Sequence, residues 1–157
     1  MPNWCSGVLK VRGTKENILN FLKNGIEPTH VNKKHDVVID EDNYIDFIHP
    51  EKITHYYIKD TRRHFIEGIN NRDKYLYKYS EDTFVCVLDD FNAAWCIIPE
   101  QLAEISKKYS VDFKIYAFEC GMQFNIDIEI VAGEVVKCDE IEFDNYAWEC
   151  INPFIGG

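Results

Sequence analysis

Residues 123–131 read QFNIDIEIV, and they show the most regular alternation of apolar and polar side chains in the chain. A period of two is the signature of a β-strand with one buried face. Four apolar side chains then project to one side of the extended backbone and three polar ones to the other: Phe124, Ile126, Ile128 and Ile130 against Asn125, Asp127 and Glu129. The apolar side needs a partner layer, so we expect a helix packed over this strand.

The segments around this strand supply further strands and the helix. Alternating or continuous apolar runs predict strands at 7–13, 83–90, 112–119 and 134–137, a short strand at 37–39 and an edge strand at 74–79. Helical spacing of apolar residues predicts helices over 14–25, 60–69 and 99–109. In the last of these, Pro99 suits the first helical position and Leu102, Ile105 and Tyr109 share one face.

This order predicts an α+β fold. We expect a ferredoxin-like split βαβ plan with an antiparallel sheet, helices on one face and a C-terminal β-meander extension. No repeat or linker divides the chain, so residues 1–157 are expected to form a single domain with an irregular insertion at about 27–80.

The net charge of −10 is unevenly distributed. Residues 1–80 carry 13 Lys and Arg against 11 Asp and Glu, whereas residues 81–157 carry 4 against 16. The second half would repel phosphate backbones, so nucleic-acid binding through it is not expected, and a protein with a basic surface is the expected partner. The simpler alternative is that the acidity only aids solubility.

The chain lacks the features of an exported or membrane-bound protein. No apolar run approaches the ~20 residues that span a bilayer, and residues 1–3 do not begin a secretory signal. The six cysteines are widely spaced without a C-x-x-C pair, so we expect free thiols, most of them buried, in a cytoplasmic protein. The sequence does not indicate an oligomeric state.

Carboxylates in the second half form a candidate acidic docking surface. Its members are expected to share the solvent-facing side of neighbouring strands: Asp127, Glu129, Glu140, Glu142 and Asp144. A rival hypothesis is a small hydrolase or nuclease in which Asp127 and Glu129, or Glu119, converge in a pocket. A solvated sheet face explains the same residues without any function.

Basic and aromatic residues suggest a third hypothesis, a module that binds single-stranded nucleic acid. The candidate stripe consists of Arg62, Arg63, Arg72, Lys74, Tyr75 and Lys78. An edge strand protected by lysines from aggregation accounts for the 74–79 part equally well.

No motif indicates a cofactor, a metal or a catalytic set. Phosphate-binding glycine loops and the nucleophile-elbow motif are absent, and the histidines lack the spacing of a helical zinc site. We therefore expect no cofactor, no metal and no catalytic residue.

The N-terminal run MPNWCSGVLKVRG and a series of single positions occur in the same order as in one known family. The positions that carry it are Trp4, Cys5, Trp95, Pro99, Glu119, Gly121, Phe124, Gly133, Trp148 and Phe154. The chain resembles the YubB-type family of phage and plasmid proteins. The resemblance implies a ferredoxin-like domain and a mobile-element context, and it gives Trp4, Cys5, Trp95, Pro99, Glu119 and Gly121 structural roles.

Taken together, the sequence predicts an accessory protein of a phage, prophage or plasmid that binds another protein without being an enzyme. In a sharper form, the protein inhibits a host defence nuclease by placing its acidic half in a basic nucleic-acid channel.

Overall fold

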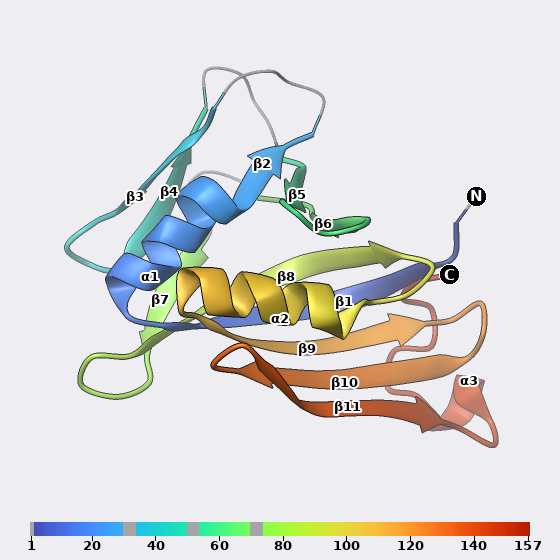
Figure 1. The fold of residues 1–157 in the computed structure, drawn as a ribbon. Helices are drawn as coiled ribbons and strands as arrows, with labels where there is room; N and C mark the ends of the chain where they lie inside the picture. Colours follow the sequence, from blue (N-terminus) through green and yellow to red (C-terminus); the bar gives the residue numbers. More distant parts are fainter. Residues whose placement is uncertain (1, 30–33, 50–53, 70–73) are drawn as a thin grey trace.

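The computed structural model describes residues 2–29, 34–49, 54–69 and 74–157. Within these ranges the chain forms eleven strands and four helical segments: β1 (Trp4–Gly13), α1 (Lys15–Asn20), the π-helical turn η1 (Phe21–Gly25), β2 (Ile26–Pro28), β3 (Asp36–Ile39), β4 (Tyr44–Ile48), β5 (Tyr56–Ile58), β6 (His64–Ile66), β7 (Lys74–Lys78), β8 (Phe84–Ala94), α2 (Pro99–Tyr109), β9 (Asp112–Glu119), β10 (Phe124–Val131), β11 (Glu134–Glu142) and α3 (Tyr146–Glu149). Figure 1 shows their arrangement.

All described strands belong to one sheet, and every pairing in it is antiparallel. The main path runs β11-β10-β9-β1-β8-β6-β5-β2. β8 pairs with β1 on one edge, and its other edge is shared, because the N-terminal part of β8 pairs with β7 and the C-terminal part with β6. The sheet therefore forks at β8 into the branches β7-β4-β3 and β6-β5-β2.

A buried aromatic cluster fills the fork. Phe47 of the first branch and Tyr56 of the second lie 5.7 Å apart between ring centroids, and His35 contacts both rings. His35 donates a hydrogen bond from Nε2 to the Leu22 carbonyl oxygen at 2.6 Å. η1 contacts both β2 and β3, so it holds the two branches together (Figure 1).

α2 covers the other half of the sheet. It contacts β9, β10 and β11, and its buried Leu102 and Ile105 belong to the same core as Ile128 of β10. Pro99 begins the helix, Lys107 and Lys108 lie in its last turn, and Ser110 ends it in a left-handed conformation. These features agree with the helix predicted over 99–109.

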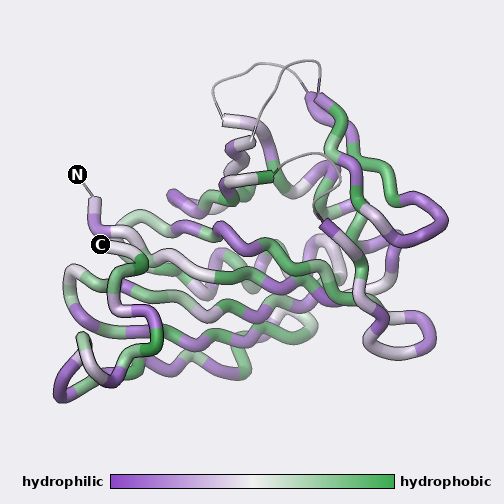
Figure 2. Tube along the Cα trace, turned by 180° about the vertical axis from the view of Figure 1, so that it is seen from behind, coloured by the Kyte–Doolittle hydropathy of each residue, from purple (hydrophilic) through white to green (hydrophobic). Residues whose placement is uncertain are grey.

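The C-terminal segment 143–157 packs on the opposite face of the sheet from α2. Tyr146 and Cys150 are buried there against Phe118. The Tyr146 hydroxyl donates to Asn125 Oδ1 at 2.9 Å, so Asn125, which the period-two pattern turns toward solvent, is itself buried. Figure 2 shows this segment in front of the sheet when the molecule is seen from behind.

The predicted fold class was wrong. A ferredoxin-like split βαβ plan with helices on one face does not describe this molecule, because a large antiparallel sheet of eleven strands dominates it. The short strands β3 to β7 occupy much of the expected irregular insertion, and β10 and β11 widen the sheet further. α3 also lies on the face opposite α2.

The helix predicted over 60–69 was also wrong. Residues 64–66 form the strand β6, in which His64 and Ile66 are buried and Phe65 is half-buried. Arg63, directly before it, has a left-handed φ of 61°, which a continuous right-handed helix excludes. By contrast, Ile18, Phe21 and Leu22 are buried on the face predicted for 14–25, although the second half of that segment is a π-helical turn.

Gly7 lets the central strands approach closely, and this yields a prediction. A Cβ atom at Gly7 would lie 2.0 Å from the Tyr116 carbonyl oxygen of β9, where only backbone movement could relieve the overlap. We expect Gly7→Ala to lower the free energy of unfolding by about 3 kcal/mol or more.

Chemical denaturation measures this loss, and Gly13→Ala is the matched control. Its Cβ would meet the Val111 side chain at 3.2 Å, which a small side-chain shift accommodates. Equal stability of Gly7→Ala and the unsubstituted protein would contradict the close approach of β1 to β9.

Candidate interaction surfaces

The predicted acidic docking residues do not share one surface. Asp127 and Glu129 lie on the face of the sheet opposite α2, on the same side of β10 as the buried Asn125. Glu140 pairs with Ile126 and Glu142 with Phe124, so these two carboxylates lie on the α2 side. The set therefore splits between the two faces of the sheet.

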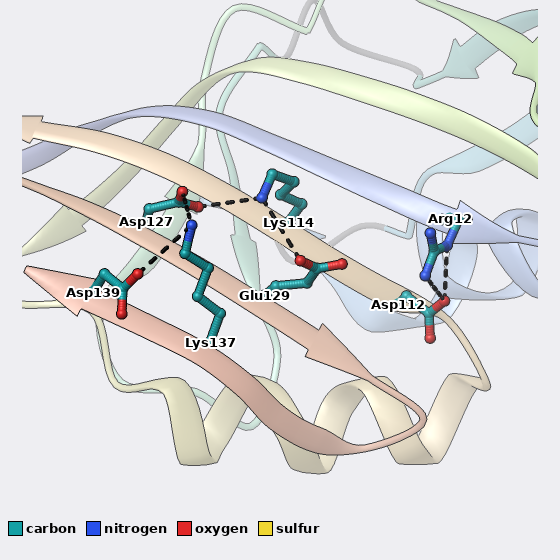
Figure 3. Close-up of polar contacts among 7 residues, drawn as sticks. All are labelled: Arg12, Asp112, Lys114, Asp127, Glu129, Lys137 and Asp139. Atoms are coloured by element: carbon teal, nitrogen blue, oxygen red, sulfur yellow. Dashed lines mark hydrogen bonds and ion pairs between the residues drawn. The ribbon is translucent and has the colours of Figure 1, made fainter.

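Asp127 and Glu129 belong to a network of ion pairs with lysines (Figure 3). Asp127 is 2.6 Å from Lys137 Nζ and 3.3 Å from Lys114 Nζ, and Glu129 is 3.8 Å from Lys114 Nζ. Lys137 also lies 3.6 Å from Asp139. Because each carboxylate faces an ammonium group, this part of the sheet is not a purely anionic surface.

The electrostatics of Asp127 agree with a structural role. Partial burial acts to raise the pKa of this carboxyl, but hydrogen bonds from Lys137 and Lys114 outweigh it and lower the pKa overall. A carboxylate held ionised between two ammonium groups is a poor general acid. Along the same face, Arg12 pairs with Asp112 at 2.8 Å and completes a row of alternating charge.

The Glu119 side chain points to the α2 side of the sheet, opposite to Asp127, and is hydrogen-bonded within the turn that follows β9. Its side chain is buried on the α2 side and accepts hydrogen bonds from the backbone amides of Gly121, at 3.1 Å, and Met122, at 2.5 Å. A Cβ at Gly121 would lie 2.9 Å from Glu119 Oε1, so Gly121 makes room for this contact. Glu119 therefore lies on the other face of the sheet from Asp127 and Glu129, and its carboxylate is engaged by the amides of its own turn.

Cys5 and Trp4 are parts of the packing at the end of β1. Cys5 is buried, and burial raises the pKa of its thiol to about 12, with the nearby Glu119 acting in the same direction. A thiol with this pKa stays protonated at neutral pH and is not a nucleophile. Trp4 contacts Phe65 of β6 edge to face, with ring centroids 5.9 Å apart.

The described residues of the predicted basic and aromatic stripe do not form one continuous surface. Lys74 is buried and pairs with Asp89 at 2.9 Å, and Tyr75 stacks edge to face with Tyr44 and Tyr77. Lys78 is exposed at the end of β7. Arg62 and Arg63 lie in the β5–β6 turn, on the other branch of the sheet, and Arg72 lies outside the described residues.

Asp144, the last member of the predicted set, lies in the C-terminal segment, which also carries a group of exposed apolar side chains. We call this surface the acidic edge. It consists of the carboxylates Asp144 and Glu149 and the apolar residues Trp148, Ile151 and Phe154, all of which belong to the C-terminal segment 143–157. The three apolar side chains are 84%, 83% and 92% exposed.

The backbone of the acidic edge is firmly held. Tyr146 and Cys150 are buried beneath it, and the Cys150 amide donates to the Tyr146 carbonyl oxygen at 3.0 Å. Asn145 caps α3 by accepting from the Trp148 amide, and Glu149 accepts from the amides of Asp144 and Asn145. Trp148 and its apolar neighbours are therefore exposed on an ordered, anchored segment.

The turn that holds Arg62 and Arg63 forms a second feature that the sequence did not reveal. Together with Trp95, Cys96, Ala94 and Ile98 these arginines line a cavity of about 190 Å³. The two sides of this cavity come from residues about 30 positions apart, so no local pattern could indicate it. The family resemblance predicts structural roles for Trp95 and Pro99. Trp95 lines this cavity, and Pro99 is the first residue of α2.

No cluster of His, Cys, Asp or Glu suited to a metal ion occurs among the described residues. In the same part of the chain, no helix has the length and apolar character to cross a membrane. No family model, no curated protein and no solved structure matches this sequence.

Two buried histidines make stability depend on pH. Burial lowers the pKa of His64 to about 4, and burial also lowers the pKa of His35, although its hydrogen bond to Leu22 partly opposes this. In the unfolded chain a histidine has a pKa near 6.5, so protons favour unfolding. The stabilisation is complete above about pH 6.5 and is lost as the pH falls toward 4.

We expect His64→Gln to reduce this pH dependence, because glutamine can still accept the Ile98 amide that now donates to His64 Nε2 at 3.1 Å. Between pH 7 and pH 5 the variant should lose about 2 kcal/mol less unfolding free energy than the unsubstituted protein. Urea denaturation at both pH values measures this. The exposed His55, changed to Gln, is the control, and identical pH profiles for all three proteins would contradict the assignment.

Proposed function

We propose that this protein is a non-enzymatic protein-binding module that docks onto a basic partner surface through the acidic edge. The observation that carries the proposal is the exposure of Trp148, Ile151 and Phe154 on an anchored segment. Tryptophan and phenylalanine are enriched at protein interfaces, and clustered exposed apolar residues mark interaction sites.

Charge indicates the chemistry of the partner. From residue 138 onward the chain has five Asp and Glu residues and neither Lys nor Arg. The carboxylates of the acidic edge would attract a basic surface and speed association, while the apolar side chains would supply most of the affinity. A solubilising role alone explains the acids but not the three exposed apolar groups beside them.

Proteins that bind nucleic acids are the class of partner with the required charge. Their channels are lined by Lys and Arg and can receive an acidic competitor in place of phosphate. In this form of the proposal the protein acts as an accessory factor of a phage, prophage or plasmid and inhibits a nuclease of the bacterial host. The acidic edge would then cover the channel that the nuclease uses for its substrate.

The test begins with the double variant Trp148→Ser/Phe154→Ser. The unsubstituted protein and the variant are each used to capture proteins from bacterial lysate, and a captured protein is then purified and titrated by calorimetry. Loss of two interface anchors should weaken binding by about 30-fold or more. The affinity of the unsubstituted protein should also fall at least about tenfold when salt rises from about 50 to 300 mM.

Tyr77→Ser is the matched control, because Tyr77 is a similarly large exposed side chain on β7, away from the acidic edge. It should bind like the unsubstituted protein. A partner that binds the double variant and the unsubstituted protein equally, or whose affinity is insensitive to salt, would refute the docking proposal.

Competition distinguishes the nuclease form of the proposal. If the acidic edge occupies a nucleic-acid channel, double-stranded DNA should displace the protein from its purified partner in a concentration-dependent manner. A partner that holds DNA and this protein at the same time would overturn the inhibitor form and leave the docking surface intact.

A further inference from the structure

The cavity lined by Arg62, Arg63 and Trp95 has the chemistry of a small anion site. Arg62 and Arg63, two exposed arginines of one turn, line a space of about 190 Å³, and the described residues that line it include no carboxylate. In a chain with a net charge of −10, two arginines without an acidic partner in their cavity are unusual. Guanidinium groups bind phosphate with paired hydrogen bonds.

Trp95 adds a flat apolar wall to this positive cavity. Its side chain is 56% exposed, so one side of the indole is open to a ligand. Tryptophan and arginine side chains both stack on planar rings. The combination suits a phosphate group joined to an aromatic base, since the phosphate can enter the cavity while the base lies on the indole.

The backbone on both sides of the cavity adopts conformations that these residues disfavour. Arg63 and Trp95 have left-handed φ angles of 61° and 74°. Bulky residues rarely adopt this region, and such strain concentrates at functional sites. Ala94 bonds to the Arg63 carbonyl oxygen at 3.1 Å, so the two strained residues are parts of one hydrogen-bonded unit.

Further hydrogen bonds fix the walls of the cavity. The Arg62 amide donates to Gln101 Oε1 of α2 at 2.7 Å, and the Trp95 amide donates to the Asn3 carbonyl oxygen at 2.8 Å. The Ile98 amide donates to His64 Nε2. Ile98 is also the N-cap of α2 and lacks a side-chain cap, so the positive end of this helix lies beside the arginines. The backbone around the cavity is thus held in place by hydrogen bonds.

We propose that this cavity binds a nucleoside monophosphate, with the phosphate held by Arg62 and Arg63 and the base stacked on Trp95. A free mononucleotide fits better than a nucleic-acid strand. A strand requires a basic groove that follows several phosphates, whereas this volume encloses about one phosphate and part of a sugar. The site is separated from β11 by β1, β9 and β10, so the inference does not depend on the proposed docking function.

The test uses adenosine 5′-monophosphate as the probe, titrated by calorimetry into the unsubstituted protein. Arg63→Gly and Trp95→Gly are the informative variants, because glycine adopts the left-handed conformation without strain and therefore preserves the backbone of the site. We expect each variant to weaken binding by at least tenfold. Inorganic phosphate should bind the unsubstituted protein at least tenfold more weakly than the nucleotide, because it cannot stack.

Lys78→Ala is the charge-matched control, since it removes one positive charge on β7 and should leave the affinity unchanged. Trp148→Ser/Phe154→Ser should also bind the nucleotide normally, which separates this result from that for the acidic edge. The inference is overturned if the nucleotide does not bind at millimolar concentration, if Arg63→Gly binds it equally well, or if a single-stranded oligonucleotide binds more tightly than the mononucleotide.

Discussion

The shared edge of β8 determines the shape of the whole molecule. Its eleven residues are long enough to pair with β1 on one side and with two separate strands on the other. Because β6 and β7 pair with different parts of the same edge of β8, the sheet divides into two branches with a wedge-shaped space between them. η1 and the cluster of His35, Phe47 and Tyr56 fill that wedge, so the two branches pack against the same buried residues.

The same fork explains where the candidate surfaces lie. β6 brings Arg62 and Arg63 to the end of β8, and the end of β8 supplies Trp95 to the same cavity. At the other limit of the sheet, β10 is the one partner of β11 among the described strands, and the segment after β11 folds back on the face that α2 does not cover. The molecule thus presents two chemically different surfaces, one lined by two arginines and a tryptophan, the other carrying carboxylates and exposed apolar side chains.

Local patterns predict those elements whose stability is largely local. The period of two places Ile128 and Ile130 in the core, and helical spacing with Pro99 at the first position defines α2. The strands β5 and β6 have three residues each, too few for a period to be recognised, and they exist because of pairings with distant residues. The fold class was wrong for this reason.

The candidate sites show the same limit. Alternation along each strand predicts that the acidic residues share one solvent-facing side. The pairing of Ile126 with Glu140 and of Asp127 with Asp139 instead assigns them to two faces, and a register shift after Glu129 changes the alternation again. Lys114 and Lys137 then neutralise Asp127, a contact between three strands that no single strand reveals. Tryptophan and phenylalanine are usually buried, so the sequence alone does not distinguish Trp148 and Phe154 from core residues. Their exposure is evident only from the three-dimensional structure.

The pairing of β1 has a consequence for biosynthesis. Trp4 pairs with Ala94 and Gly13 with Phe84, and the second partner strand, β9, is made later still. At roughly 5–20 residues per second, a ribosome takes several seconds to supply the first of these partners. During that interval the apolar side chains of β1 have no sheet to enter. Native pairing of β1 is therefore postponed until β8 and β9 have left the ribosome, a long-range closure of the kind that slows folding.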